Sequence, residues 1–240
     1  MFNEEQYNTL PTYTVQDESM VRTFMTGVFS WMFLALALTA ATSYYVAMTP
    51  SILRLLVTPT GLSMFGWIVM FAPIGFVLLM SFRFQKLSAT ALTGLFLVYA
   101  VLVGLSLSFI FLAYSMGSIA TTFGVTSLTF GVMAVAGYTT KTDLTRFGSI
   151  LMMALVGIII ASLINFFLKS DTMQYLISFI GVLIFTGLTA YDVQKLKRMG
   201  SEMVAGQEST RKYAIMGALS LYLDFINLFL FLLRFMGRRN

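Results

Sequence analysis

The sequence predicts an all-α integral membrane protein with seven transmembrane helices. Of its 240 residues, 58% are hydrophobic and only 10% are charged, which a soluble domain could not carry without exposing large apolar patches. Seven apolar runs each approach the roughly 20 residues with which a helix crosses about 30 Å of hydrocarbon. The runs are continuously apolar, whereas a membrane β-strand alternates apolar and polar residues over about 10 positions. The pattern therefore favours helices over a barrel.

The seven expected spans follow one another in the chain with short connections. The first span contains no charged residue, and the last contains a single acid, Asp224. Their bounds are Phe24 to Met48, Leu62 to Met80, Ala91 to Met116, Ile119 to Tyr138, Phe147 to Leu168, Tyr175 to Tyr191 and Ala214 to Phe235.

Two polar stretches lie outside these spans. Residues 1–21 form a polar N-terminal segment, and Asp192 to Tyr213 is expected to be a polar loop. Neither is long enough for a second domain, so residues 22–240 are expected to form one membrane domain. The N-terminal segment is acidic, whereas a cleaved signal peptide begins with basic residues. We therefore expect the first helix to be retained.

The positive charges indicate a topology rather than a nucleic-acid partner. The net charge is +5 and the isoelectric point is near 9.5, but the basic residues are distributed between the apolar runs. Cytoplasmic loops carry the excess of Lys and Arg, and most of these residues fall on one side if the N-terminus is inside. The inside set is Arg22, Arg83, Lys86, Lys141, Arg146, Lys195, Lys197, Arg198, Arg211 and Lys212, and the outside set is Arg54, Lys169, Arg234, Arg238 and Arg239.

This count predicts a cytoplasmic N-terminus and an external C-terminus. An alternative keeps the basic tail of Arg234, Arg238 and Arg239 inside by making the last helix re-entrant.

The composition also restricts the chemistry. The chain contains no cysteine and no histidine, which excludes disulfides, thiolate or imidazole metal ligands and imidazole bases. We expect no enzymatic activity and no tightly bound cofactor.

Ionisable residues inside the hydrocarbon carry the remaining functional signal, because they are costly there and usually mark ion paths, proton relays or buried pairs. Asp224 lies about 10 residues into the last span. Its expected partner is Asp192, at the end of the sixth span, because consecutive helices tend to pack as neighbours. Two carboxylates that approach closely cannot both stay ionised cheaply, so they share a proton. The pair is a candidate pH sensor.

Structural alternatives exist for both residues. Asp192 is also explained as a carboxylate at a helix end, facing the cytosol and paired with Lys195 or Lys197. Asp224 is also explained as a protonated hydrogen-bond donor to a Ser, Thr or Tyr of another helix.

Three segments resemble the Bax inhibitor family of membrane proteins. They are ALSLYLDFINLFLFLLRFMG at residues 218–237, TAYDVQKLK at the end of the sixth span, and TSLTFGVMAVAGYTTKTDLTRFGS at residues 126–149. With the seven apolar runs, the resemblance extends from about Arg22 to the C-terminus. The compact chain is similar to bacterial members, which implies the plasma (inner) membrane; a eukaryotic member would lie in the endoplasmic reticulum membrane.

The resemblance implies two three-helix layers around a central seventh helix, and a pH-sensitive leak of calcium as a permeant ion. The family's two gating carboxylates match Asp192 and Asp224, which would form the hydrogen-bonded pair that closes the pore and would contact calcium transiently. A family arginine near the end of the second helix interacts with this pair. Arg83 is the preferred match, because a guanidinium grips a carboxylate in bidentate fashion, and Lys86 is the alternative.

Two other functions are compatible with parts of this pattern. One is a non-conducting adaptor that restrains a membrane protease or a cell-death factor. The other is an intramembrane aspartyl protease, for which Tyr191-Asp192 resembles the first motif. The second motif of those enzymes is Gly-x-Gly-Asp, whereas Leu221 and Leu223 occupy the glycine positions here.

Overall fold

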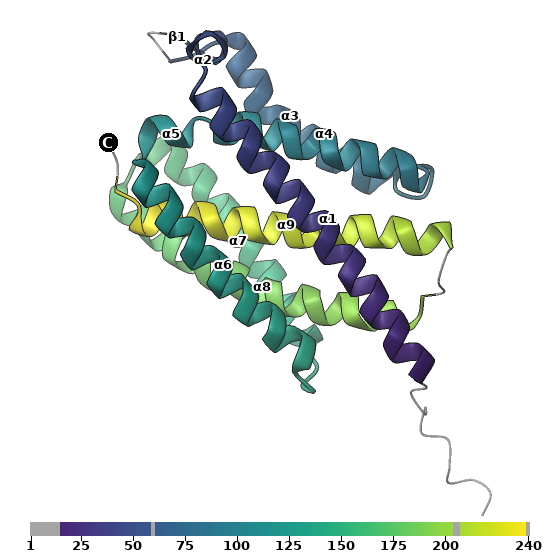
Figure 1. Ribbon diagram of the computed structural model, residues 1–240. Helices are drawn as coiled ribbons and strands as arrows, with labels where there is room; N and C mark the ends of the chain where they lie inside the picture. The colour runs from purple at the N-terminus through teal and green to yellow at the C-terminus, as the bar shows by residue number, and fades with distance from the viewer. Residues whose placement is uncertain (1–14, 59–60, 204–206, 239–240) are drawn as a thin grey trace, which may run out of the picture.

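A computed structural model describes residues 15–58, 61–203 and 207–238 (Figure 1). Within these residues, seven helices are long and apolar enough to cross a membrane, which confirms the predicted fold class. The elements in order are α1 (Val15–Ala47), α2 (Pro50–Leu56), β1 (Val57–Thr58), β2 (Gly61–Leu62), α3 (Met64–Arg83), α4 (Ala89–Leu107), α5 (Ile110–Ala113), α6 (Met116–Thr139), α7 (Thr145–Leu168), α8 (Asp171–Ser201) and α9 (Glu208–Met236).

Helix α9 forms the centre of the bundle. It packs against α1, α4, α6 and α8, and Figure 1 shows it running between the α3–α4 pair and the group of α6, α7 and α8, with α1 crossing it. In its most apolar stretch 61% of the residues are buried, against 17% in α3 and in α7. The last helix is therefore the core, and α3 and α7 turn most of their apolar side chains to lipid.

Serine side chains define where several helices begin. A serine directly before an apolar run accepts a hydrogen bond from a backbone amide in the first turn, which satisfies one of the free amides at a helix start. Four helices begin in this way, with bonds to Ser63 from Gly66, to Ser88 from Ala91, to Ser115 from Ser118 and to Ser170 from Met173.

The predicted polar loop from Asp192 to Tyr213 is wrong for most of its length. Helix α8 continues to Ser201, and α9 already begins at Glu208. The charged residues after Tyr191 mark where the chain leaves hydrocarbon, and a helix can continue past that boundary into water. Asp192 consequently lies inside a helix rather than at its end.

The first connection also differs from the expected short loop. Helix α2 begins with Pro50 at its first turn, a position that proline favours. Strands β1 and β2 then form a small antiparallel hairpin before α3. Helix α1, the first span, begins at Val15, before its predicted start at Phe24.

The re-entrant alternative for the last helix is wrong. Helix α9 is continuous over 29 residues. Its C-terminal end lies beside the start of α6, where the amide of Arg238 donates to the Ser118 hydroxyl at 2.9 Å. The helix therefore runs the length of the bundle and does not turn back.

Candidate functional site

Asp224 lies in the interior of the bundle. It is 5% exposed on α9, and the neighbouring Leu221 and Leu228 are fully buried. Its Oδ2 atom is buried and has no hydrogen-bond partner among the described residues. A buried oxygen without a partner is rare in folded proteins and costs free energy. The structural alternative, in which a protonated Asp224 donates a hydrogen bond to a Ser, Thr or Tyr of another helix, therefore finds no partner at Oδ2 among the described residues.

Asp192 faces α9 from α8. The hydroxyl of Ser220 donates to Asp192 Oδ2 at 2.5 Å. Ser220 precedes Asp224 by four residues, so both side chains are on the same face of α9. The structure thus places both aspartates at the α8–α9 contact, with Asp192 opposite Ser220 and Asp224 one turn of α9 further on. The hydrogen bond that closes this contact comes from Ser220 rather than directly from Asp224.

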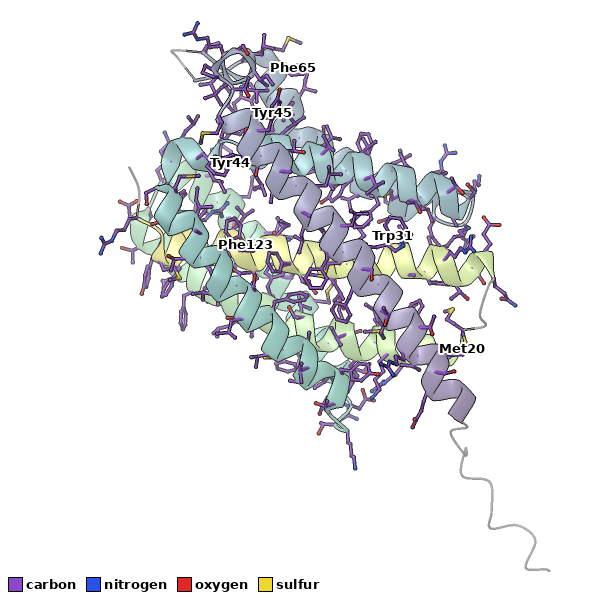
Figure 2. The ribbon with its side chains drawn as sticks, in the orientation of Figure 1. Met20, Trp31, Tyr44, Tyr45, Phe65 and Phe123 are labelled. Atoms are coloured by element: carbon purple, nitrogen blue, oxygen red, sulfur yellow. The ribbon has the colours of Figure 1, made fainter. Side chains whose placement is uncertain are left out.

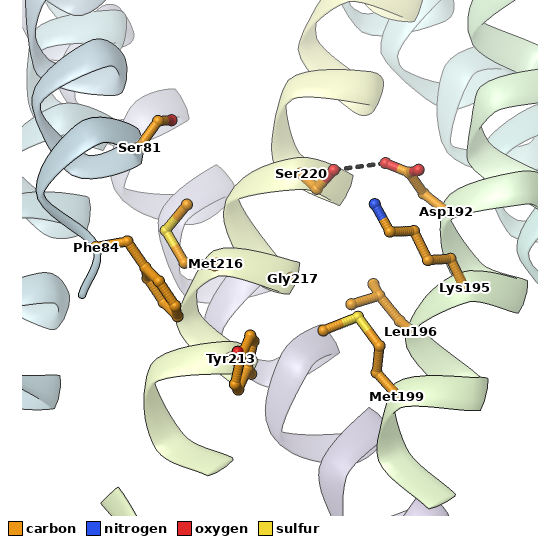
Figure 3. A pocket seen from close by; sticks show the side chains of 10 residues that line it. All are labelled: Ser81, Phe84, Asp192, Lys195, Leu196, Met199, Tyr213, Met216, Gly217 and Ser220. Atoms are coloured by element: carbon orange, nitrogen blue, oxygen red, sulfur yellow. Dashed lines mark hydrogen bonds between the residues drawn. The ribbon is translucent and has the colours of Figure 1, made fainter. Parts of the chain in front are cut away.

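A pocket of about 320 Å³ ends at this hydrogen bond (Figure 3). Its other lining residues are Ser81, Phe84, Lys195, Leu196, Met199, Tyr213, Met216 and Gly217. Asp224 does not line this pocket and lies one helical turn beyond Ser220, about 6 Å further along α9. Both partners of this hydrogen bond therefore line the pocket, and the buried carboxyl group of Asp224 lies outside it.

The basic residue at this pocket is Lys195. Figure 3 shows its amine pointing toward the Asp192 carboxyl group, although no ion pair within 4 Å joins these two described residues. Arg83 is the last residue of α3, and Lys86 is in the turn that follows. Both are exposed, and neither lines the pocket. In this conformation the structure does not bring Arg83 or Lys86 to the aspartates.

Ser220 is a functional candidate that the sequence alone does not single out. Its spacing of four residues from Asp224 is the one sequence feature that points to it, because side chains four residues apart lie on the same face of a helix. Lys195, three residues after Asp192, is one of the two partners that the structural alternative gives to Asp192, and it lines the pocket without forming that ion pair.

A second polar cluster fastens the connection between α6 and α7 to α8. Arg198 forms an ion pair with Asp143 at 2.7 Å. Gln194 donates to the carbonyl of Thr142 and accepts from the amide of Leu144. Lys197 donates to the carbonyl of Tyr138 at 2.7 Å and lies over its ring. Lys197 is therefore turned away from Asp192 and does not form the pair that the structural alternative proposed.

Comparison with known proteins identifies the family. The profile of the family described as inhibitor of apoptosis-promoting Bax1 matches residues 21–240. The chain belongs to the Bax inhibitor family. The inner membrane protein YbhL of Escherichia coli K12 is 49% identical over 227 residues, which cover 94% of this chain and 96% of YbhL. Proteins of Borreliella burgdorferi and Rickettsia prowazekii are each 45% identical, over 90% and 93% of this chain and 92% of each relative.

The site of this Bax inhibitor family protein offers oxygen atoms to a cation. Two carboxylates and one hydroxyl, from Asp192, Asp224 and Ser220, are hard ligands of the kind that calcium prefers. They supply fewer oxygens than the six to eight that calcium takes, so water or carbonyl groups would have to complete the shell. The donor set suits a transient contact better than a tight site.

The exposed ion pair between Asp143 and Arg198 predicts an effect of pH on the stability of the protein. The pKa of Asp143 lies below its ordinary value of 3.8, because the Thr145 hydroxyl, the Arg198 guanidinium and the Thr145 amide donate to its carboxylate. A carboxyl group whose pKa is lower in the folded state stabilises the folded protein at pH values above its ordinary pKa. This stabilisation is lost as the pH falls through the pKa of the folded state.

We therefore expect Asp143→Asn to lower the melting temperature in detergent slightly at neutral pH, and this difference should shrink below about pH 4. The effect is small because the pair is exposed and screened by solvent. Asp171→Asn, at the exposed start of α8, is the control. An Asp143→Asn difference that grows in acid would contradict the assignment.

Proposed function

We propose that this multi-pass Bax inhibitor family protein is a pH-sensitive calcium leak, gated by Asp192 and Asp224. The observation that supports it most is the buried, unpartnered Oδ2 of Asp224, one turn beyond the hydrogen bond between Ser220 and Asp192. A carboxyl group inside the hydrocarbon usually belongs to an ion path or a proton relay. The proposal gives neither aspartate a catalytic role.

The proposed location is a bacterial inner membrane with a cytoplasmic N-terminus. The similarity to an inner membrane protein of Escherichia coli supports the membrane, and the excess of Lys and Arg supports the orientation. In that orientation the pocket at Asp192 opens toward the cytoplasm, because it lies where α8 ends and α9 begins.

The gating step follows from charge. When the pair shares a proton, one carboxyl group is neutral and α8 and α9 remain in contact through Asp192 and Ser220. When both groups are ionised, the two like charges repel each other across that contact, and together they attract a divalent cation. Acid therefore favours closure, and neutral or alkaline pH favours calcium passage.

The test is calcium flux into proteoliposomes that hold a calcium-sensitive dye, at about pH 6 and about pH 8. We expect wild-type flux to rise with pH. Asp192→Asn, which removes one ionisable group, should lose that rise because its pair can no longer carry two charges. Asp171→Asn is the matched control on the same helix, because it is exposed and distant from the pocket, and it should behave like the wild type.

Two outcomes would overturn the proposal. Folded protein that carries no calcium above empty liposomes would favour a non-conducting adaptor. An unchanged pH dependence in Asp192→Asn would show that the pair does not set the gate.

A further inference from the structure

A groove on the lipid-facing side of the bundle runs between α1 and α6, with α9 as its floor. Two adjoining hollows of about 370 and 400 Å³ form its apolar part, and they share Leu36, Ala40, Phe123 and Phe225. Phe123, labelled in Figure 2 on α6, packs edge-to-face on Phe225 of α9 at 5.5 Å between ring centroids. The groove is therefore lined mainly by apolar side chains of α1, α6 and α9, and also by Leu107 of α4 and by Ile110 and Phe111 of α5.

This groove continues to a basic end. A third hollow, of about 380 Å³, shares Phe29 and Phe33 with the apolar part and is also lined by Arg22 and Tyr138. The same Arg22 and Tyr138 line a wider hollow of about 800 Å³. The four hollows therefore adjoin one another through shared lining residues, from near Met20 at the start of α1 (Figure 2) along the apolar spans.

The wider hollow carries a surplus of positive charge. It is lined by Arg22, Lys141, Lys197 and Arg198, with Glu18 as its acidic residue. Lys197 and Arg198 are engaged with Tyr138 and Asp143. Arg22 and Lys141 are exposed, and neither forms an ion pair with a described residue. Two cations therefore face outward where the apolar groove reaches the end of the bundle.

We propose that this groove binds one anionic phospholipid. Its phosphate lies at Arg22 and Lys141, and one acyl chain lies between α1 and α6. Charge complementarity selects the headgroup, because basic pockets between transmembrane helices attract anionic lipids. The apolar part of the groove favours a ligand with an acyl chain over a soluble phosphate, because almost all of its lining atoms are carbon. This inference does not depend on the calcium leak.

The test uses the full-length protein in detergent with equal amounts of dioleoyl phosphatidylglycerol and dioleoyl phosphatidylcholine, counted by native mass spectrometry. We expect the wild type to retain one phosphatidylglycerol in preference to phosphatidylcholine. Arg22→Gln combined with Lys141→Gln should reduce that preference by about thirtyfold, from the usual contribution of two basic residues near an anionic surface. Arg54→Gln combined with Arg146→Gln removes two exposed cations outside the groove and should not reduce it.

A second pair of variants tests the acyl chain. Ala40→Phe places a ring in the apolar groove and should lower lipid retention, whereas Leu34→Phe, on an exposed position of α1 outside the groove, should not. An excess of glycerol 3-phosphate should fail to displace the lipid, because it has no chain. Equal retention of the two lipids by the wild type would overturn the proposal. So would equal losses in the Arg22/Lys141 and Arg54/Arg146 variants, or full displacement by glycerol 3-phosphate.

Discussion

Asp224→Asn is expected to keep calcium flux at the low acid level of the wild type at every pH between about 6 and 8. The amide of asparagine is neutral at all these values and donates a hydrogen bond, as a protonated carboxyl group does. The wild type should change by up to about tenfold per pH unit, the limit for a single titrating proton. The measurement is dye-reported flux in proteoliposomes over a pH series.

The melting temperature of Asp224→Asn distinguishes an effect on gating from a loss of folded structure. Asp224 Oδ2 is buried without a partner, so Asp224→Asn breaks no hydrogen bond at that atom. The melting temperature of Asp224→Asn in detergent should therefore stay close to that of the wild type. A folded variant whose flux still rises with pH would exclude Asp224 as the titrating group.

Tyr222→Ala is expected to have the largest effect on stability. Tyr222 is fully buried on α9, and its ring packs edge-to-face on Phe96 and Tyr99 of α4. Its hydroxyl is 2.7 Å from the Thr39 hydroxyl of α1, which donates to the carbonyl of Ala100 at 2.8 Å. This one side chain therefore joins the central helix to both α1 and α4.

Removing the ring leaves a cavity, and the loss should be about 3 kcal/mol. The value is at the lower end for an aromatic residue, because detergent and lipid, unlike water, also solvate an apolar side chain in the unfolded state. Thermal or denaturant unfolding in detergent measures it. Tyr222→Phe should lose only about 1 kcal/mol, the usual net value of one hydrogen bond. Tyr45→Ala, at a position that is 64% exposed on α1, should be nearly neutral, and a similar loss there would contradict the assignment.

The sequence predicts the fold well because hydrophobic length is the dominant constraint in a membrane. All seven spans appear in their expected order. Their ends are less predictable, because a helix can extend beyond the hydrocarbon where polar side chains meet water. Helix α8 shows this most clearly, since it continues past Lys195, Lys197 and Arg198 to Ser201. The hairpin before α3 has no periodic signal long enough to detect.

The site is predicted in part. Asp224 is conspicuous as an acid within an apolar run, and the proximity of Asp192 follows from the packing of consecutive helices. The contact from Ser220 and the position of Lys195 depend on the rotation of α8 against α9, which hydropathy does not report. The resemblance and the bidentate geometry of a guanidinium favour Arg83, but the structure places it on an exposed helix end outside the pocket.

The most direct test of a gate set by Asp192 and Asp224 compares the wild type with the Asp192→Asn/Asp224→Asn double variant. Both are reconstituted at equal protein density, and calcium entry is followed over a series from about pH 6 to about pH 8. The account predicts flux that rises with pH in the wild type and a flat profile in the double variant. The same rise in a folded double variant would contradict it.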